Sequence, residues 1–333
     1  MKNISILKII PIEPLPFNSP DYFLYFSSYE VNKGSIVKCE LRNKKIYGYV
    51  YELIDFKDAK KLVKDLEYQL KNIEGIFLKN PFISEVQEVL ASWISKNYGI
   101  SLAHSFYFFL SFYKKIESNY KPSPTKGNKF EKIYLNEFDK EILNNKPVLI
   151  ITPTESYAKH LYENLKKEVN ELILLDLDER KENFNKFIQI ILNKEDKIFI
   201  GSKNSVFLPW QKLNSIVIYK EGDIFYKEFF KIPSFNYLNI IEKLAKILKT
   251  KLIIIDKFPS LKTIVEKKIE KPIKNIDFDT FSTIFELTNI LEKHKNAKVF
   301  VPTKLTAKKM LCNICFYEFN CPKCNYPLNI YED

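Results

Sequence analysis

The chain has 333 residues, of which 46% are hydrophobic, and a formal net charge of +11 at pH 7. This length supports two or three domains with cores of their own, and the composition argues against a disordered chain. No apolar run approaches the roughly 18 residues of a membrane-spanning helix, and Glu13 and nearby prolines interrupt the N-terminal apolar stretch. We therefore expect a cytoplasmic protein with no signal peptide and no membrane partner.

The positive charge comes almost entirely from lysine, since Arg42 and Arg180 are the only arginines. An excess of cations makes a polyanion such as DNA a reasonable partner, because binding releases counterions from the phosphates. The same lysine-rich, glycine-poor usage is typical of an AT-rich genome, so charge alone leaves a nucleic-acid partner undecided. The shortage of arginine disfavours bidentate base recognition and an arginine finger.

Residues 1–110 are predicted to form a small β-rich domain. Val37–Glu40 and Ile46–Tyr51 have the composition of two hairpin strands. Ile83–Asn97 carries apolar side chains at helical spacing and predicts a helix. The next stretch, residues 111–130, contains two prolines and five lysines and is predicted to be a basic linker.

Residues 131–276 alternate between helix and strand patterns. The predicted strands are short and β-branched, as in a parallel sheet covered by helices on both faces. The expected elements are a helix at 134–144, a strand at 147–152, a helix to 169, a strand at 172–177, a helix to 192, strands at 198–200 and 216–219, a helix at 237–248 and a strand at 251–256. This alternation predicts an α/β fold.

A nucleotide-driven motor needs an acidic pair where the strand at 216–219 ends, to hold Mg2+ and to orient the attacking water. This chain has Tyr219 and Lys220 there. Around that point IGSKNSVFLPWQKLNSIVI, followed by EGDIFYKE, resembles the first motor lobe of the PriA (primosomal protein N′) replication-restart helicase family, whose pattern is close to IGTRSALFAPFPNLGLIIVDEEHDSSYKQ. The resemblance implies a RecA-like helicase lobe at residues 131–276 without the Mg2+ carboxylate.

The family's P-loop, GVTGSGKTE, has its counterpart in SPTKGNKFE at residues 123–131. A P-loop needs glycines for close backbone approach to the phosphates, and a hydroxyl after its lysine for Mg2+. Ser123, Lys126 and Asn128 replace the glycines, and Phe130 replaces the hydroxyl. We therefore predict that ATP hydrolysis is lost, that ATP and Mg2+ are not cofactors, and that Lys129 is a solvated or phosphate-contacting residue.

Residues 1–110 resemble the 3′ DNA-binding domain of the same family, in which PLP, FDY, a hairpin and a helix ending in WISxYY follow one another. Asp21 and Tyr22 match the family's DY, and Lys71 falls where the family has a lysine in its terminal-nucleotide pocket. The resemblance implies that Asp21 helps to hold the 3′ end of a nascent strand; the alternative is that it only caps a turn. Pro20 replaces the family's Phe, and Leu41–Lys44 offers no clear counterpart of its hairpin glycine.

Residues 277–333 resemble the opening of the family's second motor lobe and are too few to complete it. Four cysteines there have the spacing C-x2-C-x5-C-x2-C, which predicts zinc knuckles: Cys312, Cys315, Cys321 and Cys324. In the family the two pairs serve two different zinc ions. Three alternatives stay open: one Zn2+ held by all four thiolates, two half sites completed by a partner chain, or free thiols.

Together these patterns predict a shortened, motor-dead PriA-like protein that binds forked or single-stranded DNA, at a 3′ strand end, in the primosome and in replication restart. The predicted DNA contacts are Asp21, Tyr22, Lys44, Lys45, Lys71, Lys126 and Lys129. The expected partners are DNA and, beyond it, single-stranded-DNA-binding protein or other replisome proteins. Two rival hypotheses are an ATP-dependent 3′–5′ helicase with unusual motifs and a replisome adaptor with negligible affinity for DNA.

Overall fold

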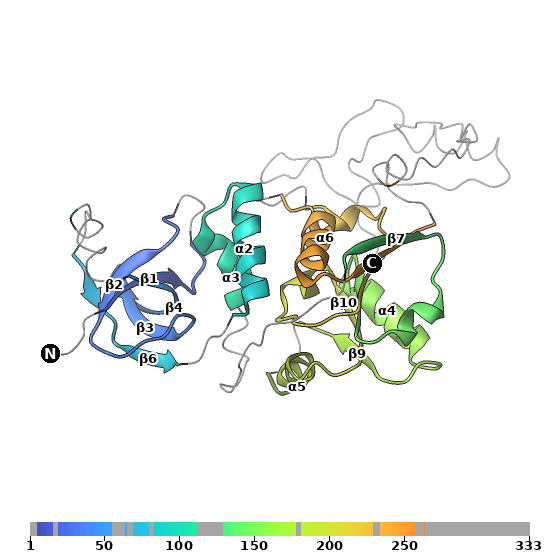
Figure 1. Ribbon diagram of the computed structural model, residues 1–333, viewed down its shortest axis with the longest axis horizontal. Coiled ribbons are helices and arrows are strands. Elements are labelled where there is room, and N and C mark those ends of the chain that lie inside the picture. The colour runs from blue at the N-terminus through green and yellow to red at the C-terminus, as the bar shows by residue number, and fades with distance from the viewer. Residues whose placement is uncertain are drawn as a thin grey trace, which may run out of the picture. The chain divides into compact units, whose positions relative to one another are not determined.

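The computed structural model describes residues 5–15, 19–54, 64, 69–79, 83–111, 129–177, 181–228, 234–257 and 263 (Figure 1). Within these residues a β-rich N-terminal domain is followed by two helices and then by a parallel sheet covered by helices. The predicted mixed α/β fold is therefore confirmed. The predicted second lobe with its four cysteines, and most of the predicted linker, lie outside the described residues.

The N-terminal sheet has six strands in the order β5-β2-β1-β4-β3-β6. The strands are β1 (Ser5–Pro11), β2 (Phe23–Ser27), β3 (Ile36–Leu41), β4 (Lys44–Ile54), β5 (Lys71–Asn72) and β6 (Gly75–Leu78). Successive side chains of a strand point to opposite faces, so alternate residues share one core. Leu7, Val37 and Val50 belong to this core and are fully buried.

The predicted hairpin is formed by β3 and β4, and its turn consists of Arg42 and Asn43 alone. Both residues are left-handed, with φ of 50° and 61°. Positive φ at both central residues is the requirement of a type I′ turn, whose twist matches that of the strands. A tight turn therefore forms without the family's glycine, although a left-handed arginine costs about 1–2 kcal/mol.

Two helices follow the sheet, α2 (Glu85–Tyr98) and α3 (Leu102–Leu110). Ser84 begins α2 with a capping box, in which its side chain accepts from the Gln87 backbone and the Gln87 side chain accepts from the Ser84 N–H. Gly99, at φ 63°, ends the helix in the left-handed conformation. The helix predicted at 83–97 is thus confirmed with slightly shifted ends, whereas α3 was not predicted.

The second sheet has six parallel strands in the order β7-β12-β11-β8-β10-β9. They are β7 (Glu131–Leu135), β8 (Val148–Thr152), β9 (Leu172–Leu175), β10 (Ile198–Ser202), β11 (Ser215–Tyr219) and β12 (Lys251–Ile255). The helix predicted at 134–144 is wrong. That segment holds the end of β7 and the 3-10 helix η2 (Lys140–Asn144), because Glu131–Leu135 extends the sheet beside β12.

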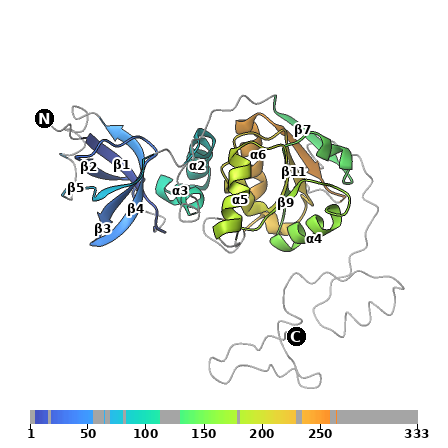
Figure 2. The same ribbon diagram turned by 90° about the horizontal axis from the view of Figure 1, so that it is seen from below.

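Helices cover both faces of the parallel sheet (Figure 2). One face packs against η2 and α4 (Glu155–Leu165), and the other against α5 (Lys181–Leu192), α6 (Tyr237–Leu248) and the 3-10 helix η3 (Lys203–Phe207). This arrangement explains why β8, β10 and β11 are apolar on both sides. In the described residues no helix has both the length and the apolar character to cross a membrane.

The two helices that follow the N-terminal sheet also contact the parallel-sheet region, within one compact unit. The Gln87 side-chain amide donates to the Phe207 carbonyl at 3.1 Å, and the Tyr98 hydroxyl donates to the Asn236 carbonyl at 3.0 Å. The ring of Phe108 stacks on that of Phe207, with centroids 5.3 Å apart. These contacts connect α2 and α3 to η3 and to the start of α6.

Candidate functional site

Asp21 lies just before β2 and contacts the start of α3. Its Oδ1 accepts a hydrogen bond of 2.6 Å from the backbone N–H of Leu102, the first residue of that helix. The first backbone N–H groups of a helix have no partner inside it and favour an anion nearby. One carboxylate oxygen of Asp21 therefore contacts the start of a distant helix, while the residue as a whole remains exposed.

Lys71 and Tyr22 have partners other than Asp21. Lys71 Nζ lies 2.6 Å from Glu40 Oε1, and Lys71 pairs with Tyr25 in the parallel contact between β5 and β2. Lys8 Nζ lies 4.8 Å from the centroid of the Tyr22 ring. The described contacts thus hold Asp21 and Lys71 separately, and a pocket formed by the two stays a prediction.

The hairpin end of the N-terminal domain is basic. Lys44 and Lys45 begin β4 and are exposed, and Lys45 is 3.4 Å from the Glu74 carboxylate. Five cations lie along this part of β3, β4 and β5, against the carboxylates of Glu40 and Glu74: Lys38, Arg42, Lys44, Lys45 and Lys71. Of the two predicted linker lysines, Lys129 directly precedes β7, and Lys126 lies outside the described residues.

Two aromatic residues on the same domain, Tyr47 and Phe77, were not predicted as site residues from the sequence. The rings of Tyr47 and Phe77 meet edge to face with centroids 4.8 Å apart, and Phe77 is 45% exposed. The alternation of Tyr47, Tyr49 and Tyr51 along β4 indicates one row of aromatic residues, in which Tyr49 and Tyr51 pack against Phe106 of α3. The contribution of Phe77 depends on the pairing of a distant strand, for which the sequence has no local signal.

The carboxyl end of β11 is built differently from a Mg2+ site. The strand ends at Tyr219, and Lys220 follows in the left-handed conformation with φ 56°. Lys220 Nζ lies 4.3 Å from the centroid of the Tyr157 ring. The Asp256 carboxylate at the end of β12 accepts a 2.5 Å hydrogen bond from the Gly222 N–H. The strand β11 therefore ends in an aromatic residue followed by an ammonium group.

Only the last residues of the degenerate P-loop segment, from Lys129 onward, are described by the structure. A P-loop follows a parallel strand and precedes a helix, because the phosphates bind at the helix N-terminus beyond the carboxyl end of the strand. Lys129 and Phe130 instead precede β7 and lie at its amino end. The segment that follows β7 is 136–139, reading NEFD, and it leads into the five-residue 3-10 helix η2. This segment has no glycine and no lysine.

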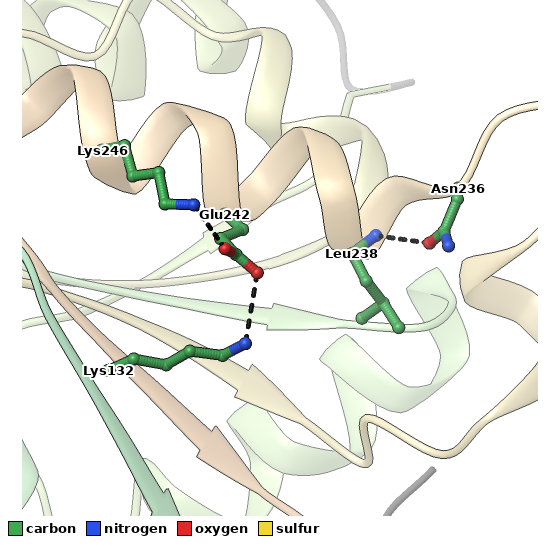
Figure 3. Close-up of polar contacts among 5 residues, drawn as sticks. All are labelled: Lys132, Asn236, Leu238, Glu242 and Lys246. Carbon is green, nitrogen blue, oxygen red and sulfur yellow. Dashed lines mark hydrogen bonds and ion pairs between the residues drawn. The ribbon is translucent and has the colours of Figure 1, made fainter. Parts of the chain in front are cut away.

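A pocket of about 300 Å³ opens between α6, the face of β7, β12 and β11, and the turn after β11. Figure 3 shows the polar contacts of Glu242 and Asn236 on and beside α6. Glu242 on α6 accepts from two ammonium groups, Lys246 Nζ at 2.6 Å and Lys132 Nζ on β7 at 3.2 Å. Burial raises the pKa of Glu242, but the hydrogen bonds and the attraction of these two lysines outweigh burial, so the pKa lies below its usual value. Asn236 caps the same helix by accepting from the Leu238 N–H at 3.1 Å. The contact between Lys132 and Glu242 therefore connects α6 to the edge strand β7, and Lys246 adds a second ion pair to the same carboxylate.

In the part of the chain that the structure describes, no group of three or more His, Cys, Asp and Glu side chains could hold a metal ion. The predicted zinc cysteines fall outside this part. Zinc binding therefore remains a prediction that rests on the spacing of the four cysteines.

These features define a mixed α/β protein in which a basic, β-rich domain precedes a helix-covered parallel sheet. Residues 12–111 match the family model described as the PriA 3'DNA-binding domain. One relative is the "Replication restart protein PriA" of Helicobacter pylori (strain ATCC 700392 / 26695), which is 24% identical over 96% of this chain and 56% of the relative. Another is the "Replication restart protein PriA" of Rickettsia prowazekii (strain Madrid E), which is 28% identical over 97% of this chain and 56% of the relative. The chain is thus similar to the PriA replication restart proteins over most of its length, at low identity, and spans about half the length of the relatives it matches.

Proposed function

We propose that this chain is a DNA-binding protein of replication restart that recognises forked or single-stranded DNA at a 3′ strand end. The observation that carries the proposal is the match of residues 12–111 to a 3'DNA-binding domain, since this range covers most of the β-rich domain together with α2 and α3. The five cations near its hairpin supply the charge that phosphates require.

Recognition of a strand end would use the free oxygen of Asp21. One oxygen accepts from the Leu102 N–H, and the exposed residue has a second oxygen that can accept from a terminal 3′ hydroxyl. A 3′ phosphate at the same place would bring two anions together and would be repelled. Asp21 therefore distinguishes the two kinds of end by charge, while Lys44, Lys45 and Lys71 contact the phosphates of the strand.

The parallel-sheet lobe is proposed to be a RecA-like scaffold that no longer hydrolyses ATP. The support comes from Tyr219 and Lys220 at the end of β11 and from the glycine-free segment at 136–139 after β7. A DNA-stimulated ATPase assay tests this part. Phosphate release that rises with added DNA would favour the helicase hypothesis.

For the C-terminal cysteines we propose one Zn2+ held by four thiolates. Tetrahedral sulfur coordination from two C-x2-C pairs is a common structural zinc site, and the four thiolates of this chain supply that donor set. Metal analysis of the purified chain tests it, with about one Zn2+ per chain expected. One Zn2+ per chain that is held only in a dimer, and lost when the dimer dissociates, would favour half sites completed by a partner chain. No Zn2+ at all would favour free thiols.

Fluorescence anisotropy with a labelled 12-nucleotide strand tests DNA binding itself. We expect affinity to fall steeply as salt rises, because each phosphate contact contributes a slope of about −0.7 for single strands. Exchanging Lys44 and Lys45 for Ala should make that slope shallower by about 1–2. The matched control exchanges Lys166 and Lys251, which are exposed on the parallel-sheet lobe, and should leave the slope unchanged. If the unsubstituted chain binds no DNA but forms a stable complex with a replisome protein, the adaptor hypothesis replaces this one.

A further inference from the structure

A β-bulge in the N-terminal sheet turns an aromatic side chain outward. In the pairing of β3 with β6, Ile36 lies opposite Leu78 and Val37 opposite Ile76, so Phe77 is an extra residue. Bulges re-aim side chains and are frequent next to functional sites. Ile76 packs against the inner core, whereas Phe77 contacts the Tyr47 ring and is 45% exposed.

Phe77 and its neighbours form a surface that we call the aromatic face and define as Lys38, Tyr47, Gly75 and Phe77. Lys38 on β3 lies between Tyr47 on β4 and Gly75 on β6, since it pairs with both. The Tyr47 and Phe77 rings are 4.8 Å apart, edge to face. A side chain added at Gly75 would meet no atom within 4 Å, so the space beside Phe77 is open.

The charges around the aromatic face are mostly positive. Lys38 is exposed, and Lys45, two residues before Tyr47 on the same strand, is 80% exposed. Arg42 and Lys44 lie at the adjacent turn, and the Glu74 carboxylate is 3.4 Å from Lys45. An exposed Phe77 ring and a partly buried Tyr47 ring therefore lie beside lysines on a β-sheet surface. Single-strand binding grooves combine these two elements, because bases stack on the rings and the cations follow the phosphates.

We propose that the aromatic face is a stacking platform for the unpaired bases of a DNA single strand. The inference rests on the proposed function and adds a site that is separate from the strand-end residue Asp21. A duplex fits less well, because its base faces are covered by stacking and only its phosphates remain available. One or two bases stack on Phe77 and Tyr47, and Lys38 contacts the phosphate between them.

The test compares Phe77→Leu, which keeps an apolar side chain, with the unsubstituted chain. Three labelled ligands are used: a 12-nucleotide oligothymidylate, an abasic strand with the same phosphates, and a 12-base-pair duplex. Loss of one base–aromatic stack should weaken oligothymidylate binding by about 5- to 100-fold. Binding of the abasic strand and of the duplex should not change. Tyr29→Leu is the matched control, because Tyr29 is 46% exposed on the same domain but outside the aromatic face.

A second variant gives a readout that does not depend on affinity. Phe77→Trp should bind oligothymidylate as tightly as the unsubstituted chain, and its added fluorescence should be quenched when a base stacks on the indole. Equal oligothymidylate affinity for Phe77→Leu and the unsubstituted chain, or no quenching in Phe77→Trp, would overturn the stacking platform while DNA binding stands. An equal loss for all three ligands would show phosphate contacts only and would also overturn it. Failure of the unsubstituted chain to bind any DNA would instead overturn the proposed function.

Discussion

Removing the Tyr226 hydroxyl should destabilise the parallel-sheet lobe, because this hydroxyl connects the turn after β11 to two strands. Its oxygen lies 2.7 Å from the Ile151 carbonyl oxygen and 2.9 Å from that of Tyr219, and the side chain is fully buried. Burial raises the pKa of the phenol well above its usual value, so the proton that it donates is kept throughout the physiological pH range.

The expected loss in the free energy of unfolding depends on the groups that lose their hydrogen-bond partner in Tyr226→Phe. The substitution removes one buried donor, whose net contribution is about 1 kcal/mol, and leaves carbonyl oxygens in a site that water does not reach. We expect a loss of about 2 kcal/mol in the free energy of unfolding. For a unit of this size such a loss lowers the melting temperature by roughly 4–8 °C.

Urea denaturation followed by circular dichroism measures the change, with Tyr162→Phe as the matched control. Tyr162 is half-buried on α4, with Lys166 beside its ring, and no described hydrogen bond uses its hydroxyl. The control should shift the free energy of unfolding by less than about 0.5 kcal/mol. If Tyr226→Phe shifts it no more than the control does, the buried hydroxyl does not hold the turn as described.

Three further predictions concern the fold that supports the site. Replacing Arg42 and Asn43 by Asn and Gly should stabilise the chain by about 1 kcal/mol in urea denaturation, because both positions have positive φ; a loss of stability would contradict the type I′ turn. Gln87→Ala should lower the free energy of unfolding by about 1–2 kcal/mol, since it removes half of a capping box and the hydrogen bond to the Phe207 carbonyl. An unchanged urea midpoint would show that neither interaction stabilises the fold. Glu242→Gln should lower the free energy of unfolding above pH 4.5, the ordinary glutamate pKa, because the stabilisation belongs to the carboxylate. The difference between the two proteins should disappear as pH falls through the lowered pKa of Glu242 in the folded state. A constant difference in urea midpoints from pH 3 to 7 would contradict this pH dependence.

The sequence was most informative where local pattern and burial agree. The helix predicted at 237–248 and the strands around 198 and 216 form as expected, since α6 has one apolar face and β10 and β11 are buried on both sides. The helix prediction at 134–144 was wrong because the apolar residues Tyr134 and Leu135 fit the pattern of a helix as well as that of an edge strand. Only the pairing of β7 with β12 decides between the two, and such pairing is a long-range property.

The candidate site was predictable in part for the same reason. Asp21 was found through the resemblance, but its contact with the Leu102 N–H depends on α3, a helix that the sequence analysis did not identify. The P-loop comparison matched letters at 123–131 without fixing which strand they follow, and the structure places Lys129 before β7 instead of after it. Phe77 could be recognised as a candidate binding residue only from the structure, because its exposure depends on the β-bulge between β3 and β6.

Discrimination between two strand ends tests whether this chain recognises a 3′ hydroxyl. A labelled fork whose leading strand ends at the junction in a 3′ hydroxyl is titrated by anisotropy, without nucleotide, against the same fork ending in a 3′ phosphate. The account predicts tighter binding of the hydroxyl fork, by roughly tenfold for one hydrogen bond to a carboxylate. Asp21→Asn, which keeps an acceptor for the Leu102 N–H but removes the charge, should narrow that difference. Equal binding of the two forks by the unsubstituted chain would contradict strand-end recognition.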